Sequence, residues 1–179
     1  GFDVAEDGSV AAGCHDNHIY VTNAEGGLLW KLDVGKMSRH VQFSPDDRLL
    51  FTGPHADGDA VLLDATTGSP IWSYRGQDSW LRNSRFSPDG RRIVAGFSGG
   101  QLVMLNDKGI ELWEANIGEF PMVLEIDSDY NVYAAGKNRE LFAFDASGQL
   151  RWRYRVANHV VTAGSNVMSD DGQFIVVGT

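Results

Sequence analysis

The side chains best suited to bind a ligand stand between repeated strand patterns of this 179-residue sequence, where the repeat does not require them. Trp80 and Arg82 lie close together in one connection, and Arg39 and His40 lie in the preceding one. An aromatic ring beside cationic groups favours a peptide or an anionic ligand, because arginine pairs with carboxylates while the ring supplies apolar contact. We therefore predict a ligand or partner surface of six residues: Trp80, Arg82, Arg39, His40, Phe120 and His159. In the alternative interpretation, Trp80 only covers the mouth of the ring predicted below.

Histidines and aspartates on two other loops have the residue types of a metal site. His15, Asp16 and His18 share one loop, and His55 and Asp57 stand one repeat further along. Two histidines three positions apart on a loop are a weak signal for a metal ion. We therefore favour solvated turn residues over a metal site.

The segment Asp127–Asn131 matches the opening of a calcium-binding loop. The glycine and the closing glutamate of such a loop are missing, because Val132 stands at its sixth position and Asn138 at its twelfth. The segment Gly96–Gly100 has the spacing G-x-S-x-G, but we interpret it as a hairpin turn rather than a nucleophile elbow, and the chain contains no H-E-x-x-H motif. We predict no catalytic residue, no metal and no cofactor.

The elements that must position these residues repeat about every 40 residues, a period typical of β-propeller blades. Each repeat has a tryptophan four residues after a turn glycine, in the pairs Gly26 and Trp30, Gly68 and Trp72, Gly109 and Trp113, and Gly148 and Trp152. An inner turn occurs in phase as Phe43–Asp47 and Phe86–Gly90, both containing Ser-Pro-Asp. Between these turns the segments are short and contain many β-branched and aromatic residues, which indicates strands.

These patterns predict an all-β chain of four four-stranded antiparallel blades and half of a fifth, within a ring of seven or eight blades. We expect one partial propeller over residues 1–179. Its predicted blades cover 2–38, 39–80, 81–120, 121–160 and, incompletely, 161–179. The tryptophans are interpreted as packing between blades, where each buries a large apolar surface. Both ends of the sequence interrupt the repeat, so we expect a piece of a longer protein.

At these motifs the chain resembles two repeat families. Leu63–Gly68 leading to Trp72 is similar to the quinoprotein-type (PQQ-like) propeller repeat, and Phe86–Arg92 is similar to the inner hairpin of WD-repeat-like propellers. The tryptophans lack the following aspartate of WD repeats. The PQQ enzymes hold their cofactor with calcium, a stacking tryptophan and, in many members, a disulfide that Cys14 alone cannot form. The resemblance implies blades without a bound quinone.

The composition limits the classes of partner. The chain has 24 acidic and 15 basic residues, a net charge of -9. A strongly acidic protein does not suit nucleic acid or an anionic membrane surface. No apolar run is long enough to cross a bilayer, so we expect no membrane insertion. An extracytoplasmic or cell-surface location is slightly favoured.

A regular scaffold without a catalytic motif favours a non-enzymatic module that binds a protein, a peptide or a small ligand. The alternative is a fragment of a propeller enzyme, either a quinoprotein dehydrogenase or a metal-dependent hydrolase or lyase. Open blade edges expose unpaired strands, which favours self-association. A second hypothesis is therefore that two chains pair to form one larger ring.

Overall fold

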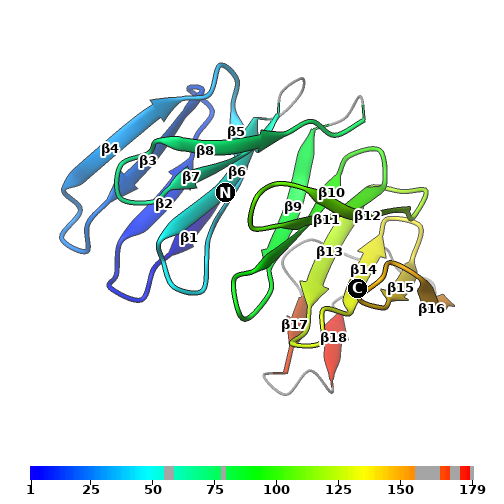
Figure 1. Cartoon of the computed structure of the whole chain (residues 1–179). Coiled ribbons are helices and arrows are strands. Elements are labelled where there is room, and N and C mark those ends of the chain that lie inside the picture. Colours follow the sequence, from blue (N-terminus) through cyan, green and yellow to red (C-terminus); the bar gives the residue numbers. More distant parts are fainter. Residues whose placement is uncertain (55–58, 78–79, 156–165, 170–173, 178–179) are drawn as a thin grey trace. The chain divides into compact units, whose positions relative to one another are not determined.

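The computed structural model describes residues 1–54, 59–77, 80–155, 166–169 and 174–177. These residues form four four-stranded antiparallel sheets and one two-stranded sheet, with no helix among them (Figure 1). The first sheet contains β1 (Phe2–Val4), β2 (Val10–Gly13), β3 (His18–Thr22) and β4 (Leu28–Asp33). The second contains β5 (Ser38–Phe43), β6 (Leu49–Pro54), β7 (Ala60–Asp64) and β8 (Pro70–Tyr74).

The other sheets follow in the same order along the chain. The third contains β9 (Leu81–Phe86), β10 (Arg92–Phe97), β11 (Gln101–Asn106) and β12 (Glu111–Asn116). The fourth contains β13 (Pro121–Ile126), β14 (Val132–Gly136), β15 (Glu140–Phe144) and β16 (Leu150–Arg155). The pair β17 (Asn166–Met168) and β18 (Ile175–Val177) forms the last.

This series of sheets confirms the predicted fold class of propeller blades. Within each four-stranded sheet, consecutive strands are neighbours, as in a meander. The chain divides into two compact units, Gly1–Leu81 and Arg82–Thr179. The described residues include no helix long and apolar enough to span a membrane. The seven- or eight-bladed ring and the single domain stay predictions.

The inner turns form because serine and aspartate satisfy the backbone locally. The Ser44 hydroxyl donates to Asp46 Oδ1 at 2.6 Å and accepts from the Leu49 amide at 3.0 Å. The Ser87 hydroxyl donates to Asp89 Oδ1 at the same 2.6 Å. The Ser44 hydrogen bond holds the pKa of Asp46 below its usual value. These contacts fix the connection between the first two strands of the second and third sheets.

Trp30 and Trp113 each pack against the sheet that follows their own. Trp30 Nε1 donates to the Ala65 carbonyl at 2.8 Å, and a Cβ at Gly68 would lie 2.8 Å from Trp30 Cε3. In the second unit, a Cβ at Gly148 would lie 2.7 Å from the Trp113 ring. Both glycines also have positive φ, 71° and 83°. Only glycine fits at these turns, because any side chain would meet the ring.

Trp152 differs from these two tryptophans in its environment. Its side chain is 44% exposed, whereas Trp113 is 8% exposed. Tyr154, two positions along the same strand, is 64% exposed. The described residues therefore leave part of one face of the fourth sheet uncovered.

Candidate functional site

The meander topology places certain connections of a blade at the same end of its sheet. Strands alternate in direction, so the start of β9, the β12–β13 connection and the β14–β15 turn share one end of the second unit (Figure 1). Arg82 lies at the start of β9, Phe120 directly precedes β13, and Lys137 directly follows β14. Neighbouring strands thus bring an aromatic residue and two cations together.

Phe120 contacts both of these cations, and we call Phe120, Arg82 and Lys137 the Phe120 cluster. Arg82 Cζ is 5.2 Å from the centroid of the Phe120 ring, and Lys137 Nζ is 5.0 Å from it. The Lys137 amide also donates to the Phe120 carbonyl at 3.3 Å. Each cation–π contact contributes about 0.5–1 kcal/mol at an exposed site. The contacts hold both charges close to one apolar surface.

The turn that carries Lys137 is tightly restrained. Asn138 Nδ2 donates to Glu140 Oε2 at 3.0 Å, and Arg139 has a positive φ of 67°. The Arg139 amide donates to the Gly136 carbonyl at 3.3 Å. A restrained turn loses little conformational entropy when a ligand binds. Chemically, the cluster suits a carboxylate next to an apolar group.

The structure places the six predicted site residues in different ways. Arg82 and Phe120 are in contact, as described. Arg39, His40 and Trp80 belong to the first unit, where Arg39 is exposed and the other two are half-buried. His159 lies outside the described residues. The assignment of these residues to one surface, and the covering role of Trp80, stay predictions.

His40 is held through its backbone by a buried hydroxyl pair. Thr52 Oγ1 donates to the His40 carbonyl at 2.8 Å, and Ser38 Oγ lies 3.1 Å from Thr52 Oγ1. The register between β5 and β6 shifts at this point. Ser38 Oγ also donates to the His40 carbonyl at 3.2 Å, so both hydroxyls hold this carbonyl at the irregularity.

The histidine loop is explained by turn contacts. Asp16 Oδ2 accepts from the Tyr20 hydroxyl at 2.6 Å, and this hydrogen bond lowers the pKa of Asp16. His18 Nδ1 lies 2.9 Å from the Asp16 carbonyl. Within the ranges given above, no group of three histidines, cysteines, aspartates or glutamates is placed to hold a metal ion. His55 and Asp57 lie outside the described residues.

The calcium-like sequence forms a closed turn around Asp127. Asp127 Oδ1 accepts from the amides of Asp129 at 2.9 Å and Asn131 at 2.8 Å. Its Oδ2 accepts from Asn131 Nδ2 at 2.9 Å and from the Tyr133 hydroxyl at 3.1 Å. Burial, together with the Asp127 charge, raises the pKa of Tyr133. Both carboxylate oxygens are therefore engaged within the turn itself.

The residues that the structure describes do not supply the calcium ligands of a PQQ site. Its calcium needs several oxygen ligands, and the residues that the structure describes gather no acidic cluster that could supply them. Cys14 is the single cysteine of the chain.

Comparison with known proteins adds one relationship. A PQQ-like family model, described as outer membrane protein assembly factor BamB, matches residues 1–127. No curated protein matches the chain. The matched range contains Arg82 and Phe120 and ends before Lys137.

Proposed function

Because the chain belongs to the PQQ-like family described as outer membrane protein assembly factor BamB, we propose that it is a non-enzymatic propeller module that binds a protein or peptide partner. The family match confirms the PQQ-like resemblance of the repeats. The partner surface is the loop end of the second unit. The favoured ligand is a segment with carboxylates next to an apolar side chain.

The observation that carries this proposal is that two cations contact the Phe120 ring. Arg82 Cζ and Lys137 Nζ lie 5.2 and 5.0 Å from its centroid. Lys137 is exposed and Phe120 is half-buried, so a partner can reach both. A carboxylate pairs with the cations, while the ring removes apolar surface of the partner from water.

The overall charge of the chain favours selective binding at this cluster. The net charge of -9 repels an acidic segment from most of the surface. The Phe120 cluster has two positive charges, so it attracts the same segment locally. Binding should weaken as salt is added, because exposed charges are screened over about 8–10 Å at physiological ionic strength.

The test titrates the isotope-labelled chain with the peptide acetyl-Glu-Leu-Glu-Glu amide, which has a leucine next to carboxylates, and follows the amide chemical shifts. Two exposed ion pairs contribute about 0.2–1 kcal/mol each and burial of the leucine about 1.5–3 kcal/mol, so we expect a Kd on the order of a few mM. The amides of Phe120 and Lys137 should shift together. Lys137→Glu should weaken binding by about fivefold or more, because attraction becomes repulsion.

Lys108→Glu is the matched control, since it makes the same charge change at an exposed turn residue. Lys108 follows β11, so the meander places it at the opposite end of the sheet. It should leave the affinity close to that of the unchanged chain. Equal losses in the two variants would show non-specific attraction and would refute the proposed surface.

We also propose an extracytoplasmic location, on the basis that the family is described by outer membrane protein assembly. Fractionation of cells that express the full-length parent protein is the direct measurement. Recovery of the protein in the cytosolic fraction alone would contradict this location.

A further inference from the structure

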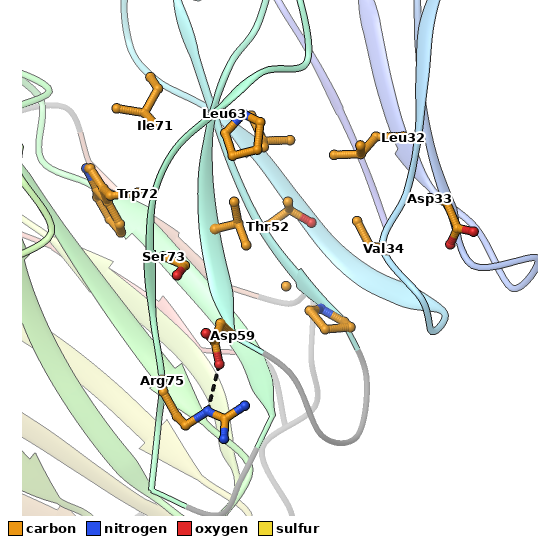
Figure 2. Close-up of a pocket in the computed structure, with 14 residues that line it drawn as sticks. Leu32, Asp33, Val34, Thr52, Asp59, Leu63, Ile71, Trp72, Ser73 and Arg75 are labelled. Carbon is orange, nitrogen blue, oxygen red and sulfur yellow. Dashed lines mark hydrogen bonds and ion pairs between the residues drawn. The ribbon is translucent and has the colours of Figure 1, made fainter.

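The first unit contains a pocket of about 530 Å³ between strand β4 and the second sheet (Figure 2). Leu32 and Val34 line one side, and Val61 and Leu63 of β7 lie among its other lining residues. Ligand sites in proteins commonly have volumes of about 300–1,000 Å³. The pocket is therefore large enough for a ligand of one or two rings.

The second unit shows what normally fills this position of the repeat. Val61 pairs with Thr52 and Ser73, just as Phe142 pairs with Ala134 and Arg153 in the fourth sheet. The same correspondence holds two residues further along the strands, on the same face of the sheet. It relates Leu63, paired with Leu50 and Pro70, to Phe144, paired with Val132 and Leu150.

Phe142 and Phe144 fill the space between the third and fourth sheets. They are 6% and 5% exposed, and their ring centroids are 6.3 Å apart. The Phe144 ring lies 6.1 Å from Trp113. In the first unit, valine and leucine replace both rings. Leu32 replaces the smaller Ala115 and returns a comparable volume, so the open part of the pocket lies beside the half-buried Val61 rather than beside the fully buried Leu63.

The walls and the rim of the pocket differ in chemistry. Thr52 is among the lining residues, but its hydroxyl already donates to the His40 carbonyl. At the rim, Arg75 Nε pairs with Asp59 Oδ1 at 2.8 Å, and the Arg75 side chain is 78% exposed (Figure 2). The interior suits an apolar ring, and polar substituents suit the rim.

From this correspondence we propose that the pocket binds a small free aromatic molecule beside Val61, at the position that Phe142 occupies in the second unit. The site is separate from the Phe120 cluster, so it does not depend on the proposed function. Its ligand is recognised by ring shape and burial rather than by charge.

The direct test uses indole and the labelled methyl groups of the complete chain. Indole has few atoms, so a Kd on the order of 1 mM is expected. Ring currents should shift the methyl signals of Leu32, Val61 and Leu63. The methyl signals of Leu105 and Leu124, buried in the second unit, should stay constant. Absent shifts at 10 mM indole, or equal shifts of all five residues, would overturn the proposal.

A pair of variants gives an independent test. Val61→Phe copies the residue of the second unit and should weaken indole binding by about tenfold or more. Val4→Phe is the matched control, because Val4 is 53% exposed on β1 and does not line the pocket. It should bind indole like the unchanged chain. Equal affinity of the Val61 variant would overturn the proposal, and if that variant does not fold, the methyl measurement decides.

A third arm distinguishes the source of the ring. Under the proposal, the tripeptide Gly-Trp-Gly binds no tighter than indole, since backbone atoms gain no contact in the pocket. A tripeptide that binds about tenfold tighter would identify a partner's side chain as the occupant and would overturn the assignment to a free molecule.

Discussion

Replacing Gly68 with alanine should destabilise the first unit more than the same change at Gly26. Both glycines stand in the turn between the third and fourth strands of their blades, with φ of 71° and 81°. A Cβ at Gly68 would lie 2.8 Å from Trp30 Cε3, whereas a Cβ at Gly26 meets nothing within 4 Å. Gly26→Ala therefore measures the cost of the backbone conformation alone.

The two costs can be separated in magnitude. An alanine in the left-handed region costs about 1–2 kcal/mol, and both variants carry this cost. Overpacking against a ring costs about 1–3 kcal/mol more, and only Gly68→Ala carries it. The free energy of unfolding should therefore differ between the variants by about 1–3 kcal/mol.

Urea denaturation followed by circular dichroism measures this difference, because the signal does not depend on the emission of Trp30. A double-mutant cycle with Trp30→Ala sharpens the result. Without the ring, the cost of Gly68→Ala should fall to that of Gly26→Ala. If the two glycine variants cost the same while Trp30 is present, the ring does not require the glycine and the packing argument is refuted.

Two further predictions concern pH and association. The Ser44 hydrogen bond lowers the pKa of Asp46 in the folded chain. Its stabilisation is therefore present above the usual aspartate pKa of about 4 and is lost as pH falls through the lower folded value. In Asp46→Asn, the free energy of unfolding should therefore change less with pH over this acid range. A pH dependence equal to that of the unchanged chain would contradict this cause. The exposed Trp152 and Tyr154 should promote self-association at high concentration. Light scattering should show less association for Trp152→Ser than for the unchanged chain. If the unchanged chain stays monomeric at about 100 µM, association through this apolar patch is excluded.

The repeat was predictable from the sequence because its markers depend on local chemistry. Glycine is required where the backbone has positive φ beside a tryptophan, as at Gly68 and Gly148. The Ser-Pro-Asp turns likewise need only neighbouring atoms. The spacing of such residues therefore predicts four-stranded sheets, and the structure confirms them.

Lys137 was missed because its role depends on register. It reaches Phe120 since Pro121 pairs with Gly136, and no spacing along the chain reveals that pairing. The pocket in the first unit left a signal that single motifs do not show. When the repeats are aligned, Val61 stands where Phe142 stands, and this change in size marks the space.

Packing of tryptophan on the following sheet has a consequence for how stability is distributed. In each unit, the tryptophan of one sheet is covered by a turn of the next sheet. The turn at Gly68 covers Trp30, and the turn at Gly148 covers Trp113. The free energy of unfolding of such an array is then approximately a sum of the stabilities of single sheets and of the interface energies between neighbouring sheets. Removing the sheet that follows Trp30 or Trp113 would uncover that indole, so its emission can report whether the junction has formed.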